Sequence, residues 1–105
     1  MPADVVIYTT PYCFYCVRAK QLLAKKGVAF REIDTTLVRH DDAGNLEEDA
    51  RETLASRTGT RKVPQIFING VLLGGYYELS VTERSGELDQ LLSGARGAQD
   101  PNPAR

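Results

Sequence analysis

A strand–helix–strand pattern near the N-terminus most constrains the fold of this chain. Residues 5–9 (VVIYT) form a short β-branched run, typical of a strand buried on both faces. Residues 13–26 carry apolar side chains at helical spacing with lysines facing outward, and Gly27 suits the end of a helix. Residues 28–34 (VAFREID) predict a second strand. Two strands joined by a helix should be parallel, with a right-handed crossover.

The middle of the chain predicts a polar connection followed by a helix. Asn45 and Glu48 match a capping box, which predicts a helix from there to about Thr58, with Gly59 after it. The acidic residues of this expected first turn would complement the positive end of the helix. The connection over residues 37–48 is expected to be a solvated loop.

A β-hairpin and a last helical region complete the pattern. Residues 65–68 (QIFI) are followed by Asn-Gly and a second apolar run, which predicts a hairpin with a type I′ turn. Residues 77–92 are expected to be helical, with a break near residues 85–86. The order of elements therefore predicts a small mixed sheet covered by helices. Residues 1–93 are expected to form one domain, and residues 94–105, rich in Gly, Pro and Ala, a disordered tail.

Charge and hydropathy exclude several classes of partner. A net charge of −1 gives no general attraction to nucleic acid or to anionic membranes. No apolar run is long enough to span a membrane, and the N-terminal residues lack a signal-peptide pattern. We therefore expect a cytoplasmic protein with no nucleic-acid or membrane partner.

The two cysteines, Cys13 and Cys16, are three residues apart at the expected start of the first helix. In a reducing compartment such a pair is more typical of catalysis or metal binding than of a permanent bridge. Unpaired backbone N–H groups and the helix dipole stabilise a thiolate at Cys13. Cys16 follows one turn later, near enough to attack a mixed disulfide on Cys13. The pattern thus assigns Cys13 as nucleophile and Cys16 as resolving thiol.

Three other interpretations of the pair are weaker. A disulfide staple across so short a loop gives little stability. Tetrahedral zinc needs about four ligands, but there is no second cysteine pair, and the sole histidine, His40, lies in the polar connection. Inert core cysteines are a third alternative, although a helix N-terminus is an unusual place for them.

Pro64 alone indicates no more than the start of a strand.

Three segments of the chain resemble the glutaredoxins in order and spacing: VVIYTTPYCFYCVRAKQLLAKKGVAF, TGTRKVPQIFI and GGYYEL. The resemblance is to the dithiol type, with CFYC in place of the family's CPYC, and covers residues 5–92. It implies a thioredoxin-like fold whose four-stranded mixed sheet has the order 2-1-3-4. It also implies a monomeric, glutathione-dependent thiol–disulfide oxidoreductase. Its co-substrate would be glutathione, and its partners glutathionylated or disulfide-containing proteins.

The resemblance also implies roles for individual residues. Cys13 would attack glutathione-mixed disulfides, and Cys16 would resolve protein disulfides. The backbone of Val63, before a cis proline, would pair with the cysteinyl part of glutathione, and Arg61 would face its glycine carboxylate. The full set of expected glutathione-binding residues is Tyr15, Arg61, Lys62, Val63, Pro64, Gly75, Tyr76 and Tyr77.

The chain departs from the family pattern at three single positions, and its connection over residues 37–48, a solvated loop or alternatively a segment for partner recognition, is longer than in compact bacterial members. Thr10 replaces a lysine, and we expect Lys62 to restore positive charge from another side. Tyr77 replaces an acidic or polar residue. Phe14 replaces the proline of CPYC, whose loss is associated with members that hold a [2Fe–2S] cluster in a dimer, with Cys13 and a bound glutathione as ligands. Two alternative functions follow. One is a glutathione-ligated [2Fe–2S] carrier that acts as a dimer, and the other is a thioredoxin-like electron donor recharged by thioredoxin reductase.

Overall fold

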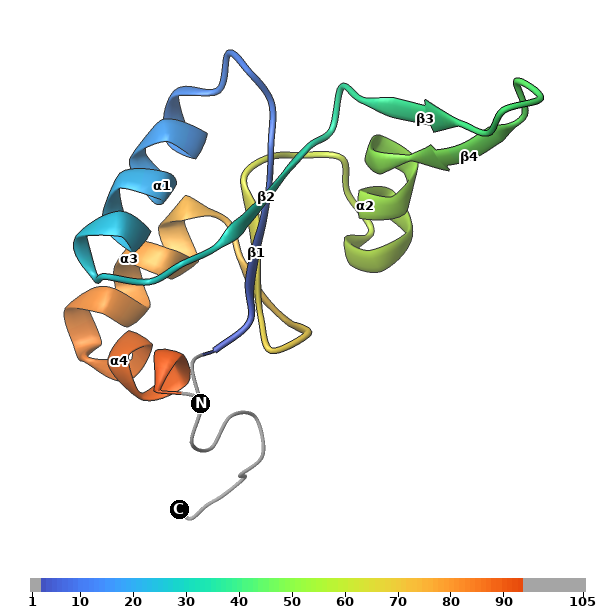
Figure 1. The fold of residues 1–105 in the computed structure, drawn as a ribbon. Coiled ribbons are helices and arrows are strands. Elements are labelled where there is room, and N and C mark those ends of the chain that lie inside the picture. The colour runs from blue at the N-terminus through green and yellow to red at the C-terminus, as the bar shows by residue number, and fades with distance from the viewer. Residues whose placement is uncertain (1–2, 94–105) are drawn as a thin grey trace.

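The computed structural model describes residues 3–93, which fold into a four-stranded sheet with helices on both faces (Figure 1). The sheet has the order β2-β1-β5-β6. Its strands are β1 (Val5–Thr9), β2 (Arg31–Asp34), β5 (Gln65–Ile68) and β6 (Val71–Gly74). The other elements are α1 (Phe14–Lys25), β3 (Val38–His40), β4 (Leu46–Asp49), α2 (Ala50–Thr58), α3 (Tyr76–Ser85) and α4 (Glu87–Leu92). The predicted α/β class and mixed sheet are confirmed, since β5 and β6 are the expected third and fourth strands.

Strand β1 is central to this sheet because it pairs on both sides. It runs parallel to β2, with Val6 opposite Arg31, and antiparallel to β5, with Val6 opposite Phe67. All five of its residues are buried, as the β-branched run predicts. The parallel pairing through α1 confirms the predicted strand–helix–strand unit. β2 begins at Arg31 rather than at Val28, whose N–H instead bonds the Leu23 carbonyl at the end of α1.

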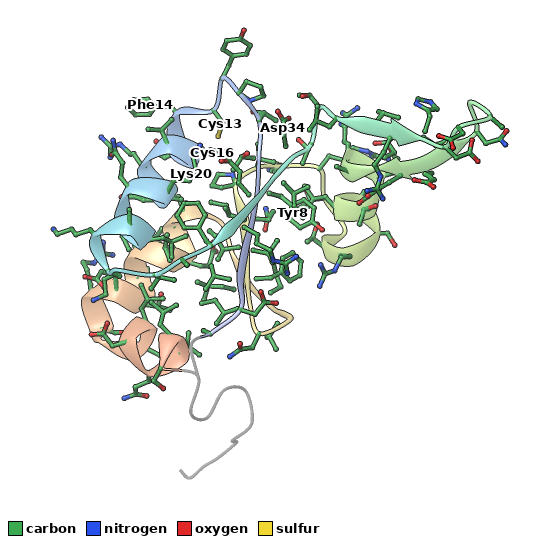
Figure 2. All side chains as sticks on the ribbon, viewed as in Figure 1. Tyr8, Cys13, Phe14, Cys16, Lys20 and Asp34 are labelled. Atoms are coloured by element: carbon green, nitrogen blue, oxygen red, sulfur yellow. The ribbon has the colours of Figure 1, made fainter. Side chains whose placement is uncertain are left out.

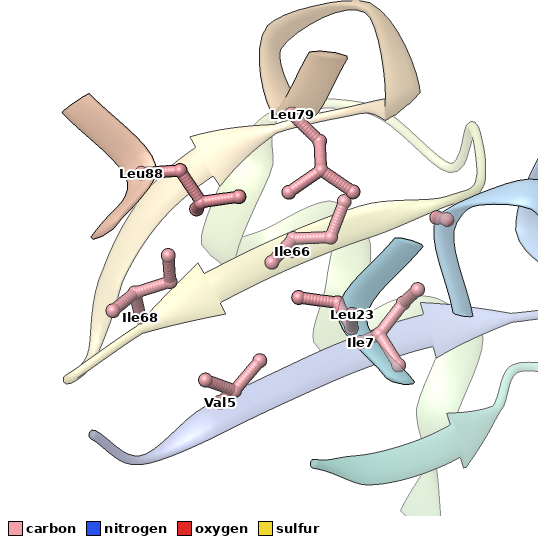
Figure 3. Packing of buried hydrophobic residues seen from close by; sticks show 8 residues of the cluster. Val5, Ile7, Leu23, Ile66, Ile68, Leu79 and Leu88 are labelled. Atoms are coloured by element: carbon pink, nitrogen blue, oxygen red, sulfur yellow. The ribbon is translucent and has the colours of Figure 1, made fainter. Parts of the chain in front are cut away.

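The core has two parts, one on each face of the sheet, because successive residues of a strand point to opposite faces. On one face, α1, α3 and α4 contribute Leu23, Leu79 and Leu88, which pack on the sheet residues Val5, Ile7, Ile66 and Ile68 (Figure 3). On the other face, Leu54 of α2 packs with Val6, Tyr8 and Phe67. The helices are thereby fixed on both sides of β1, whose carboxyl end leads into the cysteine segment.

Both predicted turns of the second half are present. Asn69 and Gly70 adopt positive φ values of 53° and 81°, as a type I′ turn between β5 and β6 requires. Gly86, with φ of 85°, separates α3 from α4 where the break was expected. The helical region begins at Tyr76, one residue before the predicted start.

The expectation of a solvated loop over residues 37–48 is wrong, and so is the predicted helix start at Asn45. The chain forms the antiparallel hairpin β3–β4, with His40 opposite Leu46, which extends away from the main sheet (Figure 1). α2 is capped by Asp49, whose carboxylate accepts the N–H groups of Arg51 and Glu52 at 3.1 and 3.3 Å. The acidic residues expected in the first helical turn belong to β4 instead.

The predicted disordered tail, residues 94–105, lies outside the described residues. Within residues 3–93, no helix has the length and apolar character needed to cross a membrane.

Candidate active site

Cys13 lies at the point where the chain turns from β1 into α1 (Figure 2). Its backbone is extended, with φ of −100° and ψ of 112°, which makes it the N-cap residue of α1. Its Sγ accepts the backbone N–H of Cys16 at 3.0 Å. A sulfur that receives a helix N–H is held where the helix dipole favours negative charge. The predicted position of Cys13 at the helix N-terminus is therefore confirmed.

The segment before β5 lies against Cys13. The Cys13 Sγ is 3.8 Å from the carbonyl oxygen of Val63, fifty residues along the chain. The Val63–Pro64 peptide bond is cis, and the Pro64 side chain is buried. This geometry leaves the backbone of Val63 beside the reactive sulfur, where an extended ligand could pair with it.

The start of α3 supplies a third wall. Gly75 lies so close to Pro64 that a Cβ on Gly75 would be 3.2 Å from the Pro64 carbonyl oxygen. The Gly75 N–H donates a hydrogen bond to Glu78 Oε1 at 2.8 Å, and this bond closes the N-terminal turn of α3. The ring of Tyr76 lies 5.7 Å, centroid to centroid, from that of Tyr15 on α1. Three segments far apart in sequence thus meet around Cys13.

Cys16 is in a different environment from Cys13. Its side chain is 1% exposed, whereas Cys13 is partly exposed. Burial and, to a smaller extent, a hydrogen bond with Cys13 raise the pKa of Cys16 to about 12, against smaller lowering effects of the Thr10 backbone and Lys20. At neutral pH Cys16 is therefore a protonated thiol, and it is shielded from solvent whereas Cys13 is partly exposed. This difference supports Cys13 as the first nucleophile.

The remaining predicted residues lie at the rim of the site. Arg61 makes a two-point ion pair with Glu52 of α2, with Nε–Oε2 and Nη2–Oε1 distances of 3.1 and 2.8 Å. This pair raises the pKa of Arg61 and lowers that of Glu52. Lys62 is exposed, and the Tyr77 side chain is 71% exposed. Their roles toward glutathione remain predictions.

The structure adds two features to those the sequence indicated. One is Glu52, which already holds the guanidinium of Arg61. No sequence spacing signals this pair, because its members come from a helix and from a later loop. The other is Lys20, four residues after Cys16 and so on the same face of α1, which the helical spacing could have indicated. Lys20 binds Glu32 of β2 at 2.9 Å.

The described residues do not by themselves form a metal site. Among them, no three His, Cys, Asp or Glu side chains gather where they could hold an ion. Cys13 offers one partly exposed sulfur, and Cys16 is buried. A [2Fe–2S] cluster would thus need most of its ligands from outside this chain.

Comparison with known proteins agrees with this geometry. A protein-family model described as glutaredoxin matches residues 5–73. The chain is 47% identical over 89 residues to a glutaredoxin of Pseudomonas aeruginosa, which covers 85% of this chain and 95% of that protein. It is 42% identical over 90 residues to glutaredoxin 3 of Escherichia coli K12, covering 86% and 98% of the two chains.

Solved structures show the same fold. The solution structure of a glutaredoxin from Brucella melitensis has a TM-score of 0.70 and 42% identity, and covers 90% of this chain and 92% of that one. A buckwheat glutaredoxin–glutathione complex has a TM-score of 0.71 and 28% identity, covering 87% and 77%. The fold and the cysteine pair together define a thiol–disulfide oxidoreductase of the thioredoxin-like class. Within that class, this chain belongs to the glutaredoxin family.

Proposed function

We propose that the protein is a glutathione-dependent oxidoreductase that reduces glutathione-mixed disulfides through Cys13 and protein disulfides through Cys13 and Cys16. The observation that carries the proposal is the position of the Cys13 sulfur. It lies at a helix N-terminus, 3.8 Å from the Val63 carbonyl and beside cis-Pro64, with Cys16 buried next to it. The buckwheat relative, solved in complex with glutathione, supports the choice of ligand.

The shape and charge of the site fit a short peptide with a carboxylate at each end. An extended cysteinyl unit can pair with the Val63 backbone and thereby bring its sulfur to Cys13. The N-terminal turn of α3, which begins at Tyr76, presents backbone N–H groups of the kind that bind carboxylates, whereas the N–H of Gly75 already donates to Glu78. The cations Arg61 and Lys62 lie next to Val63 in sequence and would attract the second carboxylate.

The reaction follows thiol–disulfide exchange. The Cys13 thiolate attacks the glutathione sulfur of a mixed disulfide, the target protein leaves as a thiol, and Cys13 carries the glutathione. A second glutathione attacks this new disulfide, which releases oxidised glutathione and restores Cys13. With a protein disulfide, Cys13 is instead bonded to the substrate, and Cys16 displaces the substrate by forming the Cys13–Cys16 disulfide.

The test is reduction of a glutathionylated substrate with glutathione as the sole reductant, coupled to glutathione reductase. We expect turnover that Cys13→Ser abolishes. Cys16→Ser should keep reduction of the mixed disulfide and lose most reduction of a protein disulfide, because only the second reaction needs a resolving thiol.

Two outcomes would contradict the proposal. If the Cys13–Cys16 pair is intact and reducible by thioredoxin reductase but gives no turnover with glutathione, the electron donor is different. If Cys16→Ser loses both activities, the division of roles between the cysteines is wrong.

A further inference from the structure

A chain of polar contacts joins α1 to the sheet on the side of Cys16. The hydroxyl of Thr9, which is 1% exposed, donates to Glu32 Oε2 at 2.7 Å. The same oxygen accepts Lys20 Nζ at 2.9 Å. These hydrogen bonds lower the pKa of Glu32, with the larger contribution from Lys20. A carboxylate that stays ionised over a wide pH range holds the ammonium group of Lys20 at one place.

Lys20 is thereby directed toward the sheet instead of into solvent. Its side chain is 32% exposed, although lysine side chains on helix surfaces ordinarily extend into water. Cys16 and Lys20 are four residues apart, so they follow one another along the same face of α1 (Figure 2). The residue that carries the fixed ammonium group is therefore one helical turn from Cys16.

Lys20 acts on Cys16 as a nearby cation, with an effect smaller than those of burial and of Cys13. The Cys16 sulfur is hydrogen-bonded with Cys13 and with the backbone of Thr10, just after β1, and it lies within electrostatic range of Lys20. The carboxylates on this side, Glu32 and Asp34, belong to β2, and Glu32 is bonded to Lys20 and Thr9. Among the charged groups of residues 3–93 that act on Cys16, Lys20 is the one that favours the thiolate.

We propose that Lys20, fixed by Glu32 and Thr9, is a positioning residue for the resolving step, in which it stabilises the thiolate of Cys16. The inference rests on the proposed dithiol function. In this step the Cys16 thiol loses its proton to solvent, and its sulfur attacks the Cys13 sulfur of a mixed disulfide. The Cys13–Cys16 bond forms, the bond from Cys13 to the substrate breaks, and the substrate sulfur leaves as a thiolate that takes up a proton. Cys16 is oxidised and the substrate sulfur is reduced.

The two cysteines can be followed separately with the disulfide dithionitrobenzoate. One equivalent added to reduced protein releases a first coloured thiolate when Cys13 attacks it, and a second when Cys16 displaces the remainder from Cys13. The first phase reports Cys13 alone, and the second reports Cys16. The variants are Lys20→Gln, Lys20→Arg and, as a matched control for lost charge on the same helix, Lys25→Gln.

We expect Lys20→Gln to leave the first phase unchanged and to slow the second about three- to tenfold near neutral pH. A nearby opposite charge shifts a titration by one to a few pH units, and the greater nucleophilicity of a more basic thiolate offsets about half of the effect. The rate of the second phase should rise at a higher pH than in the unchanged protein. Lys20→Arg should restore most of the rate, and Lys25→Gln should change neither phase.

An unchanged second phase in Lys20→Gln would overturn the inference. Equal slowing of both phases would also overturn it, because that result indicates a structural defect of the site. Glutathione-coupled turnover of the unchanged protein decides the proposed function separately, since the two-phase measurement contains no glutathione.

Discussion

At the scale of single residues, the two cysteines show how position alone separates chemical roles. Cys13 and Cys16 are the same residue type, three positions apart on one helix. Cys13 caps that helix and receives an N–H, whereas Cys16 is enclosed by the sheet and has a raised pKa. The sequence indicated this assignment because a helix N-terminus fixes which of two such residues is exposed.

The Arg61–Glu52 pair leads to a prediction about affinity. If Arg61 binds the glycine carboxylate of glutathione, Glu52 competes with that carboxylate for the same guanidinium. Glu52→Gln should therefore lower the KM for a glutathione-mixed disulfide about two- to fivefold and leave kcat nearly unchanged, because surface ion pairs are individually weak. Steady-state kinetics at low and high salt measure the effect, which should shrink as salt rises.

Glu47, which is not paired with Arg61, provides the control, and Glu47→Gln should leave the KM unchanged. The strength of the Arg61–Glu52 ion pair also depends on pH, in a direction that the pKa of Glu52 fixes. The pKa of Glu52 is lowered, so the ion pair is complete above the ordinary carboxyl range and is lost as the pH falls through the lowered value. An unchanged KM in Glu52→Gln would mean that Arg61 does not meet the substrate.

Gly75 leads to a second prediction at this scale. A methyl group on Gly75 would be 3.2 Å from the Pro64 carbonyl and must push the start of α3 away from the Val63–Pro64 segment. Gly75→Ala should raise the KM for glutathionylated substrate several-fold while the first attack of Cys13 on dithionitrobenzoate stays near its original rate. Kinetics with the two substrates measure this split. An equal loss with both would show that the substitution damages Cys13 itself.

At the scale of elements, the hairpin β3–β4 marks where sequence reasoning failed. The sequence contains two capping-box patterns whose first residues are four positions apart. One is Asn45 with Glu48, and the other is Asp49 with Glu52. Local pattern cannot choose between them. The longer-range contacts do: Leu46 pairs with His40, and the Ala50 N–H bonds the Leu37 carbonyl at 3.4 Å, which closes the hairpin before the helix begins.

The cap of α2 can be tested by removal. Asp49→Ala deletes the carboxylate that accepts two N–H groups of the first turn and should lower the free energy of unfolding by about 1 kcal/mol. Urea unfolding followed by circular dichroism measures it. Asp42→Ala, the same chemical change in the exposed turn of the hairpin, is the control and should have little effect. Comparable losses in the two variants would contradict the role of Asp49 as the cap.

At the scale of the whole molecule, the sheet joins two separate apolar layers. Leu79 is fully buried among α1, α4 and the sheet, while Leu72 on β6 is 40% exposed. Leu79→Ala should lower the free energy of unfolding by about 2–5 kcal/mol through lost contacts and the cavity left behind. Leu72→Ala, the matched change at a half-exposed site, should lower it by about 1 kcal/mol. Urea titrations decide between these values, and equal losses would mean that α3 is not held by its core contacts.

The strand order and the position of the cysteine pair could be predicted because both follow from local patterns joined by a family resemblance. Local patterns gave β1, α1 and the Asn69–Gly70 turn, since each depends on residues that are neighbours in sequence. The meeting of Cys13, Val63 and Gly75 came from the resemblance and not from periodicity. The pairing of Arg61 with Glu52 could not be predicted, because it depends on how α2 is placed once the hairpin has shifted its start.

The closeness of Cys16 to Cys13 also affects what happens to the active site when peroxide oxidises Cys13. Peroxide converts an accessible thiolate into a sulfenic acid, and further oxidation to a sulfinic acid is in most proteins permanent. Cys16 is within hydrogen-bonding reach of Cys13, so its thiol can condense with the sulfenic acid to give a disulfide and water. That disulfide is reopened by ordinary thiol exchange. Because Cys16 is buried and so shielded from peroxide, the oxidised pair can be returned to its reduced state.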